Sequence, residues 1–326
     1  MAETGDRALD EFTAQLGERN LAPLWEVLRN LVTREPKATA APVLWKFAPL
    51  REQVLRAGEV ITAEQAERRV LVLENPAFKG QARATNSLFG GVQLILPGET
   101  ARSHCHTAAA IRFILEGDGA YTSVEGEKVP MKRGDFIITP SWLYHDHGNE
   151  GTGPVMWLDG LDVHIVNLLN TSFAQEDPNI RSRPPNNPDD IPRMTFTYPY
   201  DAARGELESM RKSAPPDPAL GWKTTYLDPE TGEAPMNVMA AFLQLVPGGT
   251  ASKPYRSTDA AMFVVVEGEG RVHVGNESWD VGPNDIFVVP AWTWASFEPS
   301  EDLVLFSLSD RTLQQHLGFW REERGA

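Results

Sequence analysis

Residues 98–106 read Gly-Glu-Thr-Ala-Arg-Ser-His-Cys-His, and residues 134–149 read Gly-Asp-Phe-Ile-Ile-Thr-Pro-Ser-Trp-Leu-Tyr-His-Asp-His-Gly-Asn. Alternate side chains of a β-strand share a face, so His104 and His106 point together while Cys105 points away. His145 supplies a third imidazole from a second strand. Imidazole suits several transition metals, so this arrangement predicts a metal site formed by His104, His106 and His145.

Two further polar residues are predicted to face the same interior. His147 shares a face with His145 and could replace it as a ligand, but the spacing to Pro140 and Asn149 favours His145. His147 is then left to support the ligands or contact a substrate. Arg112 lies six residues after His106, so an unbroken strand turns it inward. A buried guanidinium needs a partner, either an internal carboxylate or a substrate carboxylate, and we favour the second.

The sequence around these motifs has the texture of a β protein. Short apolar runs are separated by Gly, Pro, Asn and Asp at regular spacing, which predicts a barrel or a sandwich. The predicted strands are residues 70–73, 91–96, 111–115, 120–124, 135–139 and 155–158.

An internal repeat shows that this β unit occurs twice. The recurring phrases are 97–101 with 247–251, 116–119 with 267–270, and 135–142 with 285–292. This register aligns His104 with Pro254, His106 with Arg256 and His145 with Ala295. We therefore expect the second copy to keep the scaffold without a metal, and Arg256 and Trp294 to fill the place of the site.

Composition limits the class of protein. The 326 residues are enough for two domains, and the net charge of −15 argues against nucleic acid or an anionic membrane as partner. A single cysteine fits a reducing compartment. The acidic N-terminus lacks an apolar signal core, and no apolar run approaches about 18 residues. These features predict a cytoplasmic protein that is neither exported nor membrane-spanning.

We expect five segments along the chain. They are a helical segment at 1–69, a metal-binding barrel at 70–170, a proline-rich connection at 171–220, a metal-free barrel at 221–308 and a C-terminal helix at 309–326. Spacings of three and four predict packing helices through Leu9, Phe12 and Leu16 and through Trp25, Leu28 and Leu31. A short helix is predicted at 63–68, and the last one at 310–321, capped by Ser309 or Asp310.

The two motifs resemble those of the cupin superfamily. The matching positions are Gly98, His104, His106 and Gly117, followed by Gly134, Pro140, His145 and Asn149. With the duplication, the chain resembles a bicupin, which implies a mainly β fold of two double-stranded β-helix (jelly-roll) barrels after an N-terminal helical segment. Over most of its length the chain also resembles the gentisate 1,2-dioxygenase and salicylate 1,2-dioxygenase family. The residues that carry this resemblance are Trp25, Trp45, Lys46, residues 67–71 and residues 110–113.

Two positions depart from the cupin pattern. Trp142 stands where a glycine usually follows the motif proline, and Ala110 or Ile111 stands where a cupin glutamate ligand is usual. Three neutral imidazoles would leave a full 2+ charge on the metal. Such a site suits a substrate that chelates through its own carboxylate and phenolate.

The resemblance implies a ring-cleaving dioxygenase with one Fe(2+) per chain in the first barrel and O2 as co-substrate. It would open an ortho-hydroxybenzoate between the carboxyl- and hydroxyl-bearing carbons, giving maleylpyruvate from gentisate. Salicylate, 5-nitrosalicylate and 1-hydroxy-2-naphthoate stay open as alternative substrates. The resemblance also implies a homotetramer.

Site roles follow from the same resemblance. Arg112 and Arg68 would anchor and polarise the substrate, although neighbouring Arg69 could take the place of Arg68. His147 would exchange a proton or hydrogen bond with the phenol oxygen. The remaining substrate contacts implied are Gln93, Asp159 and Phe89.

Two rival classes share the motif pattern. Three histidines and water also suit a zinc or manganese cupin isomerase or hydrolase. A non-catalytic bicupin that stores or senses a small acid is the other. The interior Arg112 beside ligands without a carboxylate favours the dioxygenase over both.

Overall fold

The computed structural model describes residues 2–176 and 196–326 and divides the chain into two compact units, Met1–Lys37 and Ala38–Ala326. The first unit contains α1 (Ala2–Gly17) and α2 (Leu24–Leu31), where two helices were predicted. In α2 the apolar side chains of Trp25, Leu28 and Leu31 are exposed. Within the described ranges, no helix is long and apolar enough to cross a membrane.

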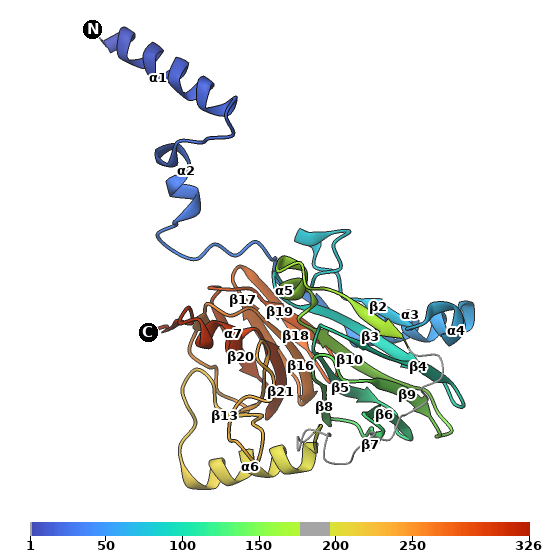
Figure 1. The fold of residues 1–326 in the computed structure, drawn as a ribbon. Coiled ribbons are helices and arrows are strands. Elements are labelled where there is room, and N and C mark those ends of the chain that lie inside the picture. Colours follow the sequence, from blue (N-terminus) through green and yellow to red (C-terminus); the bar gives the residue numbers. More distant parts are fainter. Residues whose placement is uncertain (1, 177–195) are drawn as a thin grey trace. The chain divides into compact units, whose positions relative to one another are not determined.

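The second unit begins with a β barrel made of two antiparallel sheets (Figure 1). The order in the larger sheet is β12 (Thr197–Tyr198), β8 (Phe136–Thr139), β5 (Ala110–Glu116), β10 (Val155–Leu161), β3 (Phe89–Ile95) and β2 (Val70–Val72). The order in the smaller sheet is β11 (Ala174–Glu176), β4 (Thr100–His106), β9 (His145–Asn149), β6 (Ala120–Val124) and β7 (Glu127–Pro130). Each apolar run predicted as a strand overlaps one of these strands. The short helices around them are α4 (Ala63–Ala66), η1 (Pro76–Phe78) and α5 (Val163–Leu168).

A second barrel repeats this arrangement, which confirms the expected two-barrel fold. The larger sheet has the order β1 (Val43–Trp45), β19 (Ile286–Val289), β16 (Ala261–Glu267), β21 (Leu303–Ser309), β14 (Ala240–Val246) and β13 (Trp222–Thr225). The smaller sheet has the order β18 (Glu277–Val281), β17 (Gly270–Val274), β20 (Ala295–Pro299), β15 (Tyr255–Ser257) and β22 (Glu322–Arg324).

The C-terminal helix is shorter than predicted. α7 (Arg311–His316) stops before Gly318, whose φ of +72° belongs to the left-handed region that ends helices. The chain then returns as β22, where Glu323 accepts hydrogen bonds from Arg256. The prediction of helix up to Arg321 was therefore wrong, because this tertiary ion pair replaces local helical bonding.

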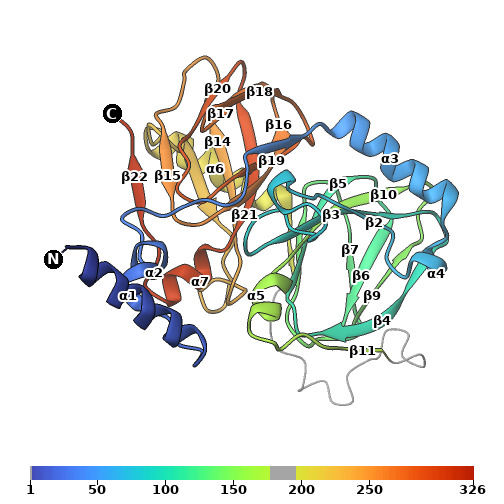
Figure 2. The ribbon, with the colours of Figure 1, turned by 90° about the horizontal axis from the view of Figure 1, so that it is seen from above.

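Each barrel is preceded by a strand and a helix that are anchored on the other barrel. β1 leads into α3 (Phe47–Val60) and the first barrel, yet it pairs with β19 of the second (Figure 2). β12 leads into α6 (Tyr200–Ser213) and the second barrel, yet it pairs with β8 of the first. The first residue of each helix is also held by the other barrel. The Phe47 N–H donates to Asp285 at 2.8 Å, and the Tyr200 N–H donates to Asp135 at 2.9 Å.

The proline-rich connection predicted at 171–220 contains regular structure where it is described, and residues 177–195 lie outside the described residues. Its prolines border α6 instead of interrupting it. Pro199 is the N-cap, where its missing N–H removes no helical bond, and Pro215 follows the C-cap residue Ala214. The connection predicted at 171–220 therefore includes a helix at 200–213, which the proline content alone did not indicate.

The second copy is shifted by one residue relative to the predicted register. Tyr255 pairs with Ala295 as His104 pairs with His145. The Trp292 N–H donates to the Ser257 carbonyl at 2.6 Å, as the Trp142 N–H donates to His106 at 2.8 Å. His104 is thus replaced by Tyr255 and His106 by Ser257, and not by Pro254 and Arg256. One inserted residue before β15 moves the side chains of that strand to the opposite face relative to the predicted alignment.

The two larger sheets pack against each other and form one hydrophobic core. Phe113 of the first barrel stacks on Phe306 of the second, with ring centroids 4.1 Å apart. A Cβ at Gly160 would lie 2.3 Å from Leu308, so glycine is what allows this close approach. Because side chains alternate, the residues that face away from this core, such as Arg112, point into the first barrel.

Candidate metal centre

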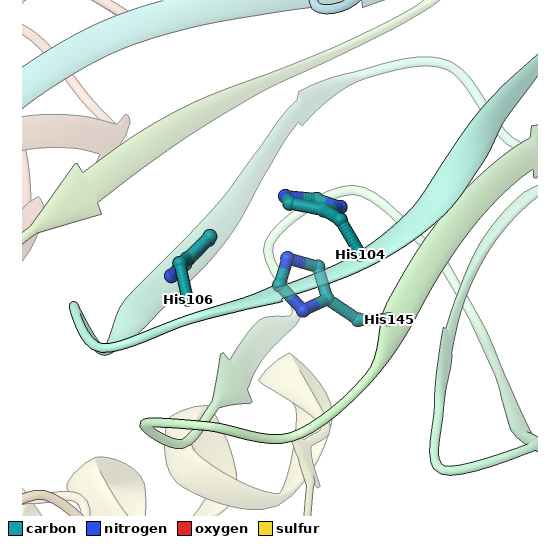
Figure 3. A group of neighbouring side chains, drawn as sticks. All are labelled: His104, His106 and His145. Carbon is teal, nitrogen blue, oxygen red and sulfur yellow. The ribbon is translucent and has the colours of Figure 1, made fainter. Parts of the chain in front are cut away.

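The three predicted histidine ligands lie together inside the first barrel. His104 and His106 lie on β4, and His145 lies opposite His104 on β9 (Figure 3). One ligand nitrogen from each ring lies within 4.8 Å of the others. Among the described residues this is the cluster of histidine, cysteine or carboxylate groups spaced for a metal, and it contains no carboxylate.

Backbone carbonyls fix the orientation of two of these rings. Nδ1 of His106 lies 2.7 Å from the Ala108 carbonyl, and Nδ1 of His145 lies 3.0 Å from the Leu143 carbonyl. A carbonyl only accepts, so both Nδ1 atoms carry the proton and both Nε2 atoms keep a free lone pair. This is the tautomer that a metal-binding imidazole needs.

Burial keeps the imidazoles neutral. It lowers the pKa of His104 to about 3, with Arg68 and His106 adding to the effect. It also lowers the pKa of His106 and takes the pKa of His145 well below its ordinary value. Metal ligation requires the unprotonated ring, so the chemistry of this donor set fits a divalent transition metal.

Of the two neighbouring arginines, Arg68 faces the histidines. Its Nη2 contacts Nδ1 of His104, lies 3.2 Å from Nε2 of that ring and donates to the Arg102 carbonyl at 2.9 Å. Arg69 instead forms a two-pronged ion pair with Glu99, at 2.9 and 2.6 Å. The alternative in which Arg69 takes the place of Arg68 is not what the structure shows.

Arg112 is buried and lies beside Asp159. Only 3% of the residue is exposed, and its Nε is 3.7 Å from the Asp159 carboxylate. Burial raises the pKa of Asp159 to about 6, although Arg112 opposes this, and the Trp157 indole donates to the same carboxylate at 2.9 Å. The internal ion pair that we ranked below a substrate role for Arg112 is therefore present. It still leaves Nε without a hydrogen-bond partner.

His147 is held on both sides. Its Nε2 lies 3.3 Å from Nη2 of Arg112, and its Nδ1 contacts the Thr122 hydroxyl. Because a guanidinium only donates, Nε2 of His147 accepts and Nδ1 carries the proton. Burial, aided by Arg112, keeps the pKa of His147 well below its ordinary value, so the ring is neutral.

Three residues around this network were not nominated from the sequence. Thr122 contacts His147, Thr139 accepts a hydrogen bond from Arg112, and Trp157 lies with its ring 5.5 Å from that of His147. Even spacing along their strands could have indicated that they face inward, but it does not indicate which inward residue touches which.

Gln93 and Phe89 lie on the inward-facing side of β3. Gln93 is 5% exposed and lies opposite Trp157, while Phe89 lies opposite Leu161 at the end of the strand. The glycine between them leaves room for the Phe89 ring, which lies 3.2 Å from where a Cβ of Gly91 would be. Both residues are thus placed toward the barrel interior.

The departure at Trp142 has a conformational cost. Trp142 adopts φ of +68°, and the equivalent Trp292 adopts +56°, which is the region where glycine is favoured. The Trp142 ring lies 4.4 Å from the Phe173 ring, and the backbone N–H of Trp142 donates to the His106 carbonyl at 2.8 Å. Cys105, by contrast, is buried away from the histidines, as predicted.

Comparison with known proteins extends the likeness over the whole chain. The cupin domain family model matches residues 91–163 and 241–307. The chain is 46% identical to gentisate 1,2 dioxygenase 1 of Aquipseudomonas alcaligenes, with 96% of both chains covered. It is 30% identical to a 5-aminosalicylate 1,2-dioxygenase of Comamonas sp, covering 97% of this chain and 90% of the relative.

A solved structure shows the same likeness in three dimensions. Salicylate 1,2-dioxygenase from Pseudoaminobacter salicylatoxidans, determined as adducts with gentisate, superimposes with a TM-score of 0.87. It is 29% identical, and the match covers 97% of this chain and 94% of the other.

Proposed function

The chain belongs to the gentisate and salicylate 1,2-dioxygenase family, and from this premise we propose that it opens the ring of an ortho-hydroxybenzoate with O2 at one Fe(2+) in its first barrel. The ring would open between the carbons that carry the carboxyl and hydroxyl groups. Gentisate is our first candidate substrate, since the 46% identical relative carries that name. Salicylate, 5-nitrosalicylate and 1-hydroxy-2-naphthoate are the alternatives.

The observation that carries this proposal is the charge of the site. Three neutral imidazoles meet without a carboxylate, and two guanidiniums, those of Arg68 and Arg112, lie around them. His104, His106 and His145 would hold the iron, which when bound supplies the redox chemistry that joins O2 to the ring. Asp159 offsets the charge of Arg112, so Arg68 and a bound 2+ ion would leave the site cationic, and a substrate carboxylate with an adjacent phenolate would supply the negative charge.

The arginines would bind and orient the substrate. Arg68 lies against His104, so its guanidinium is placed to contact a carboxylate or phenolate beside that ring. Arg112 is held by Thr139, His147 and Asp159, which restricts the conformations of its long side chain before the substrate arrives. A guanidinium fixed in this way loses less entropy on binding than a free one.

His147 would have two tasks. As a neutral ring it accepts a hydrogen bond from Arg112 and so positions that guanidinium. We also propose that it exchanges a proton or hydrogen bond with the phenol oxygen of the substrate. Gln93, Asp159 and Phe89 would complete the substrate contacts, with Asp159 acting mainly through Arg112.

The decisive experiment loads the chain with Fe(2+) without oxygen and then measures O2 uptake and ring-opening absorbance. Gentisate, salicylate, 5-substituted salicylates and 1-hydroxy-2-naphthoate are compared. We expect O2 uptake and ring opening in equal amounts with at least one of them. A purified protein that holds zinc or manganese and consumes no O2 with any of them would instead support the isomerase, hydrolase or storage alternatives.

His106→Ala tests the ligand assignment. Loss of one of three ligands is expected to lower iron affinity by more than about 100-fold and to remove turnover with it. His316→Ala is the matched control, because that histidine is exposed at the end of α7. Full iron occupancy in His106→Ala would refute the site. The proposed homotetramer is a separate prediction that light scattering can check.

A further inference from the structure

The second barrel retains a cavity at the place that the metal centre occupies in the first. Tyr255, Ser257 and Ala295, the counterparts of the three histidine ligands, all line it. The cavity has a volume of about 40 Å³. Buried apolar side chains, among them Phe263, Val272 and Phe297, fill much of the barrel interior as expected, and the cavity is the part that they leave open. Arg256 lies at the cavity and over the rings of Trp292 and Trp294, and it does not fill the interior.

Two hydrogen-bond donors at this cavity have no partner. Lys223 on β13 lies opposite Gln244 on β14. Gln244 is 1% exposed, and its side-chain Nε2 has no hydrogen-bond partner. Across residues 2–176 and 196–326, Lys223 forms no hydrogen bond or ion pair, and its ammonium lies 4.1 Å from the centre of the Phe242 ring. The buried amide N–H of Gln244 is costly to leave without a partner, and the partly exposed Lys223 ammonium lies beside it without an ion pair in the same ranges.

The other cations around the cavity are already neutralised. Arg311 forms an ion pair with Asp259 at 3.1 Å, and Arg256 forms one with Glu323 at 2.6 Å. The Tyr255 hydroxyl donates to Glu322 at 2.7 Å. Glu322 keeps its negative charge, because its partner is a neutral hydroxyl, and Lys223 is the cation at the cavity that has no direct ion pair with any described residue.

Part of the cavity wall is apolar. Phe263 and Phe297 stand where the first barrel has Arg112 and His147, and both line the cavity together with Val289. One water needs about 10–15 Å³ of such space, so the cavity accommodates about three waters or one ligand of about four heavy atoms. The shape therefore selects a small molecule with acceptor atoms at one end and carbon at the other.

We propose that the second barrel binds a small monocarboxylate of the size of acetate, held by the Lys223 ammonium and the Gln244 amide. Its two oxygens match the two unpaired donors, and its methyl group meets the phenylalanine wall. Water alone would satisfy the hydrogen bonds but would leave the lysine without a directly contacting anion. Burial, with Arg311 adding to it, lowers the pKa of Lys223 to about 7, while Asp259 and Glu322 oppose this. A bound carboxylate would restore the charged form.

The test titrates sodium acetate into the iron-loaded, oxygen-free full chain by calorimetry, with sodium chloride at equal ionic strength as reference. Lys223→Met keeps the length of the side chain and removes the charge, and Lys212→Met on the exposed face of α6 is its matched control. We expect Lys223→Met to weaken one acetate site by more than tenfold and Lys212→Met to leave it unchanged. Acetate bound at the iron site would persist in both variants, which separates the two sites.

A second variant guards against a folding defect in the first. Gln244→Glu places a carboxylate beside Lys223 and should abolish acetate binding while raising the thermal midpoint. Benzoate, whose ring exceeds the cavity, should not compete with acetate. Unchanged acetate binding in Lys223→Met or in Gln244→Glu would overturn the proposal. We expect a dissociation constant of about 1 mM, which corresponds to about −4 kcal/mol. The proposal would also be overturned if the unmodified chain bound no acetate at a concentration about 100-fold above that value.

Discussion

Arg112 is the residue where the stability of the first barrel and the proposed substrate binding depend on each other. It is buried, and Asp159 compensates its charge. Its Nη atoms are occupied by Thr139 and His147, while Nε has no hydrogen-bond partner. The guanidinium is thus oriented by the protein but not fully satisfied by it, which is the state that a substrate carboxylate would complete.

We predict that Arg112→Met lowers kcat/KM for the ring-opening reaction by about 100-fold or more, since truncating one partner of a buried charge pair costs about 2–5 kcal/mol. Substrate affinity, measured by calorimetry without oxygen, should fall by a similar factor. A phenol without a carboxylate should bind both proteins equally. Arg56→Met, an exposed change on α3, is the control.

The double variant Arg112→Met with Asp159→Asn separates binding from folding. Arg112→Met alone leaves a buried carboxylate without its partner, so part of its effect is on stability. The added Asp159→Asn should recover the thermal midpoint but not the affinity for substrate. Recovery of both would show that Arg112 acts only as a structural ion-pair partner.

At the scale of elements, the start of α5 supports the metal centre through the loop between β4 and β5. Asp162 accepts a hydrogen bond from the Ala109 N–H at 2.8 Å. The preceding Ala108 supplies the carbonyl that orients His106. Asp310 at the start of α7 is its counterpart, accepting from the Ala260 N–H at 3.2 Å in the barrel without ligands.

We predict that Asp162→Ala lowers iron affinity by about tenfold, because the loop that orients His106 loses its anchor. Iron titration of the apo chain measures this. Asp310→Ala removes hydrogen bonds from Ala260, Ser87 and Gln314, so it should lower the unfolding free energy by about 2–4 kcal/mol without weakening iron binding. Equal iron affinities in Asp162→Ala and Asp310→Ala would contradict the proposal that Asp162 supports His106 through the loop between β4 and β5.

The ionisation of Asp162 adds a pH dependence with a definite sign. Burial raises its pKa from 3.8 to about 6, so between these values the folded chain binds more protons than the unfolded chain. The contribution of Asp162 to the unfolding free energy therefore falls as the pH rises from about 4 to 6. The stability of Asp162→Asn relative to the unmodified chain should increase over that window and stay constant above it.

The sequence predicts the strands and the metal ligands better than it predicts which side chains contact one another. Alternation placed His104 and His106 on one face, and the structure brings His145 to them. The same alternation could not place Thr122 and Thr139 against His147 and Arg112, because those contacts depend on how strands pair across the barrel. The one-residue shift before Tyr255 could have been read from the sequence, because the offset between repeated phrases changes from 150 residues (97 to 247) to 151 (116 to 267) across it.

At the scale of the whole molecule, two strand–helix segments, β1–α3 and β12–α6, join the barrels into one unit, Ala38–Ala326. We call these segments the arms. α3 is fixed at its start to Asp285 of the second barrel, and its Arg51 pairs with Glu116 of the first at 2.6 Å. α6 does the reverse, through Asp135 of the first barrel and Glu267 of the second. This exchange was not foreseen, because each arm is adjacent in sequence to the barrel on which it is not anchored.

We predict that Asp285→Ala destabilises both barrels together. Asp285 accepts from the Phe47 N–H at 2.8 Å and the Gly282 N–H at 2.9 Å, and it pairs with Lys46, so its loss should cost about 2–4 kcal/mol. Hydrogen exchange followed by mass spectrometry should then show faster exchange in β4 and β9 as well as in β19. Asp280→Ala is the control, because it removes a carboxylate of the same barrel that is 77% exposed. It should change neither the unfolding free energy nor the hydrogen exchange of these strands. Faster exchange confined to the second barrel would mean that the barrels open separately and that the arms only connect them.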